Sequence, residues 1–218
     1  MTTIAIGALG GTIAMTPDSA GGGVKPSLDA DDLVAAVPEL NDIATITAKT
    51  IASVASPNLQ MGDVLAAYRY CCEQAEAGVD GIVLTHGTDT LEETAYFLDL
   101  LWDYDIPIVI TGAMRSPNLP SADGPGNILA AVVAAASTHL TGLGVLVVLN
   151  DEVHLARFVA KTNSTATWTF ASPGWGPIAR IAERRASVML TPRERPSALP
   201  VPPPSEIRIP VIECGLSD

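Results

Sequence analysis

Polar side chains are concentrated in the segment Thr85 to Thr90, which follows the apolar run Gly81 to Leu84 and precedes a segment with helical periodicity. The start of a helix offers free backbone N–H groups and the positive end of a dipole, which together can hold a carboxylate or an oxyanion. Thr88 adds a hydroxyl, and Asp89 adds a carboxylate that can receive an ammonium group. Capping would explain one such residue, whereas the cluster is larger than capping requires. His86 is more typical of a structural hydrogen-bond donor, and we assign it no role.

A second hydroxyl lies at the end of the first apolar run, Ile4 to Leu9. Gly10 and Gly11 allow the backbone to turn sharply there, and the turn presents Thr12. A threonine so placed is a candidate nucleophile, with an ordinary turn and a helix cap as the alternative for this motif alone. The glycines lack the G-x-G-x-x-G spacing, and no Gly-Lys-Ser/Thr follows them, so dinucleotide and P-loop sites lose support.

Three further candidates lie near other apolar runs. Ser56 belongs to the loop Ser53 to Asn58, and Ala113 belongs to the loop Gly112 to Ser116. Lys161 follows the apolar residues Phe158 to Ala160. A lysine that is partly withdrawn from water can act as a base toward a hydroxyl, because burial favours the neutral amine. A solvated surface lysine is the alternative.

Short apolar runs alternate with helical segments, as is typical of parallel strands joined by crossover helices. The expected strands are Ile4 to Leu9, Gly81 to Thr85, Ile106 to Ile110 and Gly144 to Leu149. The expected helices are Gln60 to Ala77, Leu91 to Trp102 and Asn127 to Thr138. Thr90 and Glu93 have the spacing of a capping box, and Ser121 to Asn127 indicates a cap and turn. The predicted fold is α/β, a mostly parallel sheet with helices on both faces in a Rossmann-like three-layer arrangement. Ligands bind such sheets beyond the carboxyl ends of the strands, where these candidates lie.

Two segments interrupt this alternation. Thr16 to Pro26 has no periodicity and contains three consecutive glycines, which predicts a mobile loop near the end of the first strand. Pro192 to Pro204 is rich in proline, which favours an extended linker. We expect a catalytic-type α/β domain over residues 1–191, a proline-rich interdomain linker over 192–206, and the first strand of a truncated C-terminal domain within 207–218.

Composition limits the partners and the compartment. The 218 residues carry a formal charge of −12, which disfavours nucleic acid and anionic membranes as partners. The three cysteines fit neither a disulfide framework nor a zinc site. The N-terminus has no basic signal region, and no apolar run approaches the roughly 18 residues of a membrane span. A cytoplasmic protein without nucleic-acid or membrane partners is therefore expected.

Taken together, the motifs resemble one family. Gly10 to Ala14 and Thr85 to Ala95 closely resemble the two signatures of bacterial-type L-asparaginases, the asparaginase/glutaminase family. Gly112 to Arg115, Ser121 to Pro125 and Lys161 to Asn163 agree in order and approximate spacing, so the resemblance covers essentially the whole chain. It implies hydrolysis of L-asparagine to L-aspartate and ammonia through a threonine acyl-enzyme, without a metal or an organic cofactor.

The resemblance also implies a role for each candidate residue. The expected catalytic residues are Thr12 as nucleophile, with Thr88, Asp89 and Lys161 as a second hydroxyl and base group. Ser56 and Asp89 are expected to hold the α-carboxylate and the α-ammonium of the substrate. The predicted substrate-binding set also includes Thr88, Gly11 and Ala113. Backbone N–H groups near Thr88 are the candidate oxyanion donors.

Two departures from the family pattern leave alternatives open. Relatives commonly carry a tyrosine in the mobile loop, whereas Thr16 to Lys25 contains none, so Asp18, Ser19 or a water is the candidate for activating Thr12. Relatives also continue into a C-terminal domain that completes a neighbouring subunit's site, which implies a homodimer or homotetramer at full length. A catalytically incomplete amino-acid-binding fragment and a related glutaminase or amidohydrolase are the alternative functions.

Overall fold

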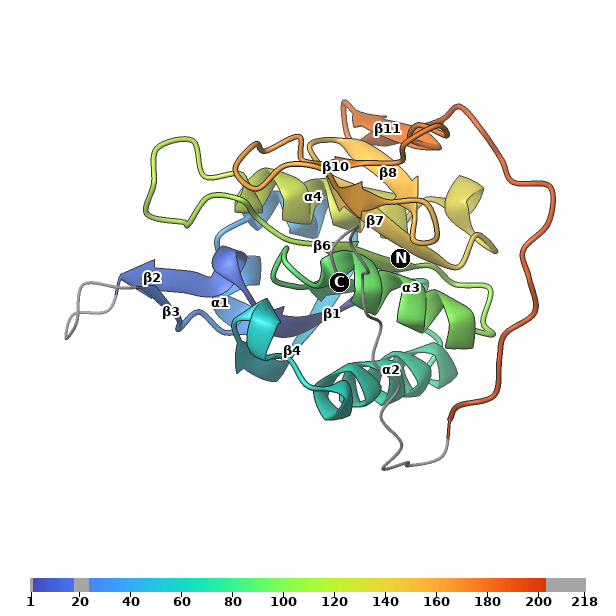
Figure 1. The fold of residues 1–218 in the computed structure, drawn as a ribbon, viewed down its shortest axis with the longest axis horizontal. Helices are drawn as coiled ribbons and strands as arrows, with labels where there is room; N and C mark the ends of the chain where they lie inside the picture. The colour runs from blue at the N-terminus through green and yellow to red at the C-terminus, as the bar shows by residue number, and fades with distance from the viewer. Residues whose placement is uncertain (1, 18–23, 203–218) are drawn as a thin grey trace, which may run out of the picture.

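The computed structural model describes residues 2–17 and 24–202. Its central element is an eight-stranded sheet with the order β12-β11-β8-β7-β6-β5-β1-β4 (Figure 1). The parallel strands are β4 (Thr45–Val54), β1 (Thr3–Gly10), β5 (Gly81–Thr85), β6 (Ile108–Thr111) and β7 (Val145–Leu149). The antiparallel strands are β8 (Glu152–Leu155), β11 (Ala179–Ala182) and β12 (Arg185–Val188). The expected mostly parallel sheet is confirmed.

Helices cover both faces of this sheet (Figure 1). One face packs against α1 (Ala30–Ala35) and α4 (Gly124–Ala135), and the other packs against α2 (Met61–Glu76) and α3 (Leu91–Leu101). Side chains of a strand alternate between the faces, so Ile4 enters the first core cluster and Ala5 enters the second. The predicted three-layer arrangement is confirmed.

Two details at helix starts differ from the prediction. The capping box at Thr90 is wrong: its side chain makes no capping bond, and its hydroxyl donates instead to the carbonyl of Ser56 over 3.1 Å. The helix predicted from residue 127 begins at Gly124, because Pro125 is tolerated in a first turn and extends the helix backwards. That helix ends at Ala135, and Thr138–Leu140 forms a separate 3₁₀ turn.

Smaller elements surround the main sheet. β2 (Met15–Pro17) pairs with β3 (Val24–Pro26), and β9 (Ala160–Lys161) pairs with β10 (Phe170–Ala171), in two separate antiparallel ribbons. The 3₁₀ turns η1 (Thr12–Ala14), η2 (Pro38–Asp42) and η3 (Ser56–Asn58) follow or precede strands. The predicted mobile loop over Thr16 to Pro26 is therefore wrong at both ends, because Thr16 and Pro17 lie in β2 and Val24 to Pro26 form β3. Residues 18–23 of that segment lie outside the described residues.

The described part of the proline-rich segment packs along α3. After Val188 the chain forms no helix or strand up to residue 202. The Arg195 guanidinium donates to the carbonyl of Trp102 over 2.5 Å, and the Leu199 N–H donates to the carbonyl of Leu100 over 2.7 Å. The domain limits proposed from the sequence remain predictions. The predicted strand at 207–212, with the rest of 207–218, lies outside the described residues.

Candidate active site

The predicted site residues lie at one edge of the sheet. The loops after β1, β4, β5 and β6 all leave the carboxyl ends of parallel strands. β1 lies between β4 and β5, so the next parallel strand along the chain, β4, is added on one side of β1, and β5 is added on the other. This is a topological switch point, where the loops diverge and leave a crevice for a ligand.

Glycines allow these loops to meet backbone to backbone. A Cβ atom on Gly11, whose φ is +84°, would overlap the backbone of Gly87 and lie 2.9 Å from the carbonyl carbon of His86. A Cβ on Gly112 would lie 2.5 Å from the carbonyl oxygen of His86. The contact between Gly11 and Gly87 brings Thr12 and Thr88, the residues that follow them, to the same edge of the sheet, although the two loops are far apart in the sequence.

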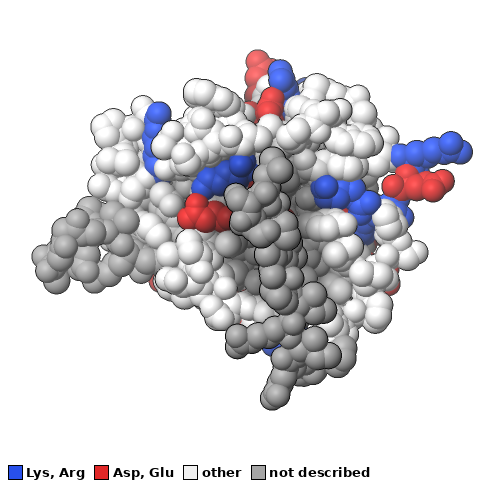
Figure 2. Space-filling view, viewed as in Figure 1, with Lys and Arg blue, Asp and Glu red and all other residues white. Residues whose placement is uncertain are grey.

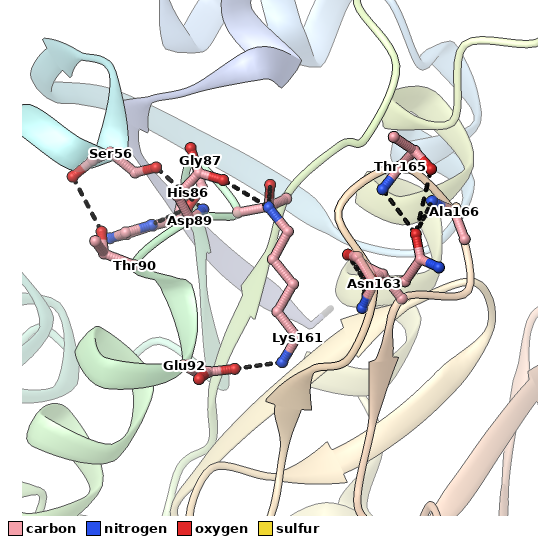
Figure 3. A network of polar contacts seen from close by, with 12 residues as sticks. Ser56, His86, Gly87, Asp89, Thr90, Glu92, Lys161, Asn163, Thr165 and Ala166 are labelled. Carbon is pink, nitrogen blue, oxygen red and sulfur yellow. Dashed lines mark hydrogen bonds and ion pairs between the residues drawn. The ribbon is translucent and has the colours of Figure 1, made fainter. Parts of the chain in front are cut away.

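Thr88, Asp89 and Lys161 form a connected polar cluster. Figure 3 shows Lys161 reaching toward Asp89. Lys161 Nζ donates to Thr88 Oγ1 over 2.9 Å and lies 2.6 Å from Asp89 Oδ1. Thr88 is 5% exposed, and the side chains of Lys161 and Asp89 are 16% and 59% exposed. Lys161 is therefore not a solvated surface lysine. The ammonium binds the Thr88 oxygen and leaves the Thr88 proton free for another acceptor, while the Asp89 carboxylate is open to a ligand.

Ser56 links the loop after β4 to the loop after β5. Its hydroxyl accepts the Asp89 N–H over 3.2 Å, and its carbonyl accepts the Thr90 hydroxyl. A Cβ on Gly87 would lie 2.7 Å from Ser56 Oγ, so the serine also packs directly on that glycine. The Ser56 proton remains available to an acceptor such as a carboxylate.

Thr12 and Ala113 lie at the ends of β1 and β6. Thr12 is half-buried at the start of η1, and its hydroxyl makes no hydrogen bond to any residue in the described ranges. Ile13 and Ala14 bury their side chains in the core and so fix the turn that presents it. The side chain of Ala113 is fully buried in the same core, which leaves only its backbone available to a ligand.

Asp123 organises the loop after β6. Its carboxylate accepts the N–H groups of Met114 and Arg115 over 3.0 and 2.8 Å and the side-chain amide of Asn127 over 3.2 Å. It occupies the N-cap position of α4 without making a capping bond. This segment is structural, as its sequence indicates, but the aspartate side chain makes no capping bond to the helix backbone and instead joins the loop after β6 to the side chain of Asn127 in α4.

Sequence reasoning did not assign a role to Glu92, and it interpreted His86 as a structural hydrogen-bond donor, which the contact to Gly87 confirms. The Glu92 carboxylate accepts the backbone N–H of Lys161. His86 is fully buried, its Nδ1 donates to the Gly87 carbonyl over 2.7 Å, and burial lowers its pKa. The position of Glu92 in the first helical turn after the polar cluster indicated that it lies near the site. Nothing in the sequence indicated that it would contact the strand of Lys161.

Within residues 2–17 and 24–202, no group of three or more His, Cys, Asp or Glu side chains is arranged to hold a metal ion. In the same ranges, none of the helices has the length and apolar character needed to cross a bilayer. On the face shown in Figure 2, basic and acidic side chains lie beside one another on a largely uncharged surface.

Comparison with known proteins gives concordant matches. Residues 3–194 match the family model described as "Asparaginase, N-terminal". L-asparaginase 2 of Bacillus subtilis (strain 168) is 44% identical over 187 residues, covering 84% of this chain and 50% of the relative. Glutaminase-asparaginase of Pseudomonas fluorescens biotype A is 40% identical over 199 residues, covering 89% and 55%.

A solved structure is similar as well. The probable cytoplasmic L-asparaginase from Campylobacter jejuni matches with a TM-score of 0.81 at 37% identity, covering 87% of this chain and 57% of that one. The chain therefore spans about half the length of the curated relatives it matches.

Proposed function

Because the chain belongs to the asparaginase family, matching its N-terminal region over residues 3–194, we propose that it carries the site for hydrolysis of L-asparagine to L-aspartate and ammonia. The observation that carries this proposal is the cluster in which Lys161 Nζ contacts Thr88 Oγ1 and Asp89 Oδ1 over 2.9 and 2.6 Å. The cluster lies beside the contact between Gly11 and Gly87, which brings a second hydroxyl, that of Thr12, to the same edge.

Thr12 is proposed as the nucleophile. Its hydroxyl oxygen attacks the side-chain amide carbon of asparagine and gives up its proton. The C–N bond then breaks, the nitrogen takes up a proton and leaves as ammonia, and an ester to Thr12 remains. Water attacks the ester carbon, the bond to Thr12 breaks, and aspartate leaves while the threonine hydroxyl is restored. A hydroxyl is a weak nucleophile at neutral pH, so a positioned base is required.

We propose that Lys161, in its neutral amine form, takes up through the Thr88 hydroxyl the proton that Thr12 gives up, and that the resulting ammonium returns a proton through Thr88 to the leaving nitrogen. The 2.9 Å contact between them provides a direct route for a proton between the nucleophile's side of the site and the lysine. Asp18 and Ser19, the sequence candidates for activating Thr12, lie outside the described residues. The contact between Lys161 Nζ and Thr88 Oγ1 is the observation that supports Thr88 and Lys161 as the proposed activating pair.

Backbone N–H groups at Thr88 are proposed to stabilise the oxyanion of the tetrahedral intermediate. His86 holds the carbonyl of Gly87, and the N–H of the same trans peptide, which belongs to Thr88, points the opposite way. That N–H donates to no residue in the described ranges. It is thus a fixed donor with an unfilled bond, which is the property that an oxyanion site needs.

Substrate binding is proposed to use charge pairing at both ends of the amino acid. The half-exposed Asp89 carboxylate suits the α-ammonium, and the free Ser56 proton suits the α-carboxylate. Gly11 and Ala113 would contribute backbone atoms.

For the full-length protein we propose a homodimer or homotetramer, as the family resemblance implies. We also propose that it works in the cytoplasm. The similarity to the probable cytoplasmic L-asparaginase from Campylobacter jejuni supports this location.

Initial rates on L-asparagine, L-glutamine and a larger amide test this function and its alternatives. We expect L-asparagine to be hydrolysed, with ammonia and aspartate released in equal amounts. Relatives named for both amides favour including glutamine, which a pocket distinguishes from asparagine by only about 1 to 3 kcal/mol. Binding of aspartate measured by calorimetry without turnover of any amide would instead support a catalytically incomplete amino-acid-binding fragment.

A further inference from the structure

Lys161 is held at both ends by one short segment of the chain. Its ammonium binds Thr88 and Asp89, and its backbone N–H donates to the carboxylate of Glu92. Figure 3 shows the lysine side chain extended between Glu92 at its backbone end and Asp89 at its tip. The segment Thr88 to Glu92 therefore contacts both the start and the tip of the same lysine.

The ribbon that carries Lys161 is not fixed by the main sheet. β9 has two residues and, among the strands that the structure describes, pairs with β10 alone, in a sheet separate from the eight-stranded one. Val159 and Phe170 bury their side chains in the core cluster that includes Leu91 and so hold the ribbon near α3. These apolar contacts are not directional. The bond to Glu92 is directional, and it lies at the residue whose ammonium must reach Thr88.

We propose that Glu92 is a positioning residue for Lys161, fixing the backbone from which the ammonium reaches Thr88 and Asp89. This inference rests on the proposed function for its effect on turnover. The lysine side chain has four rotatable bonds, and a displaced backbone would change which rotamers bring Nζ to the Thr88 oxygen. Misplacement of a catalytic group by about 1 Å can cost on the order of 100-fold in rate.

A simpler role for Glu92 is to stabilise α3, because acidic residues in the first turn favour a helix. Glu93 provides the matched comparison. Both glutamates lie in the first turn of α3, whereas Glu93 is exposed and makes no hydrogen bond to the described residues. The two roles also predict opposite outcomes for conservative substitutions at residue 92.

Glu92→Asp and Glu92→Gln separate the two roles. Aspartate keeps the charge at the helix start but withdraws the oxygen by one methylene, so we expect kcat to fall about 10- to 100-fold with little change in KM. Glutamine loses the charge but keeps an oxygen that can accept the Lys161 N–H, so we expect kcat to stay within about threefold of the unsubstituted protein. If Glu92 acts through the helix dipole, the aspartate variant stays active and the glutamine variant loses stability, which would overturn the proposal. Glu93→Gln is expected to leave kcat unchanged.

A double-mutant cycle and amide exchange complete the test. In a Lys161→Met background, Glu92→Asp should cause no further loss of kcat, because the group that it positions is gone. An additive loss would contradict a role through Lys161. Hydrogen exchange at the Lys161 amide should be faster in Glu92→Asp than in Glu92→Gln, whatever amide the protein hydrolyses. Equal exchange in the two variants would exclude the bond from the Lys161 N–H to the residue 92 side chain. This result does not depend on whether the proposed function is correct.

Discussion

The backbone of Gly11 lies directly against the backbone of Gly87, and neither residue has room for a side chain. Gly11 also has a φ of +84°, a left-handed value that residues with a Cβ rarely adopt. This contact is the point at which the loop after β1 meets the loop after β5. The proposed nucleophile and the proposed proton-exchange group follow these two glycines in the chain, so the glycine contact sets their separation.

Gly11→Ala should therefore destabilise the protein and remove its activity. The added methyl group would overlap backbone atoms of Gly87 and require a strained φ, which together cost about 2 to 4 kcal/mol. Gly126→Ala in α4 is the matched control, because nothing lies within 4 Å of the added Cβ. That change should stabilise the helix by about 0.5 to 1 kcal/mol. Denaturant unfolding measures both, and equal stability of the two variants would contradict the close contact.

Asp99 is predicted to be the buried charge whose removal most destabilises the described structure. It is 6% exposed in α3, lies 3.0 Å from the Arg157 guanidinium and 3.6 Å from that of Arg195, and accepts the Val145 N–H. Removing it leaves two cations and an N–H group without their shared partner. Asp99→Ala should lower the free energy of unfolding by about 3 to 5 kcal/mol.

The neighbouring Asp103 supplies the control for this prediction. It is exposed and makes no hydrogen bond to the described residues, so Asp103→Ala should change the free energy of unfolding by less than about 0.5 kcal/mol. Protease cleavage within 190–202 should also increase in Asp99→Ala, since Arg195 holds this segment against α3. An Asp99→Ala protein as stable as Asp103→Ala would exclude the proposed anchoring.

Acid should destabilise the protein through its buried histidines. Burial lowers the pKa of His154, and the nearby Glu152 carboxylate only partly opposes this; burial likewise lowers the pKa of His86. The unfolded chain therefore binds protons below pH 6.5, where the folded protein still excludes them. The free energy of unfolding should fall as the pH drops below that value, by at most about 1.4 kcal/mol per pH unit for each histidine.

His154→Asn tests this pH dependence. Unfolding in denaturant from pH about 7.5 to about 5.5 should show a smaller loss of stability in the variant, because one group that gains a proton on unfolding is gone. His139→Asn is the control, since His139 is exposed in Thr138–Leu140 and should leave the slope unchanged. The same slope in all three proteins would show that His154 does not contribute.

Much of the fold follows from patterns that the sequence carries locally. Alternating apolar runs and helical segments predicted the parallel strands and the three layers, because each run must bury its side chains on one face or both. The three antiparallel strands β8, β11 and β12 were not predicted. β8 and β11 have four residues each, which is too short for a distinct periodicity, and their pairing depends on contacts made across the sheet.

The site residues that belong to strand-end motifs could be predicted from the sequence. The residues that hold those motifs in place were harder to predict. The sequence placed Thr12, Thr88 and Lys161 together through a resemblance, and the structure brings Thr88 and Lys161 into contact. Thr90 resembled a helix cap but binds the loop of Ser56, because a hydroxyl at that position can accept or donate in either direction. Local spacing does not encode which loop comes close in the fold.

Thr12 is proposed as the nucleophile of an amide hydrolase. Ammonia release from L-asparagine by the unsubstituted protein, Thr12→Ala and the exposed-site control Thr138→Ala tests it most directly, with thermal unfolding in the presence of L-aspartate as the check on folding and binding. We predict that Thr12→Ala loses turnover by at least about 1000-fold while keeping the stabilisation by aspartate, and that Thr138→Ala matches the unsubstituted protein. Turnover that persists in a folded Thr12→Ala variant would exclude Thr12 as the nucleophile.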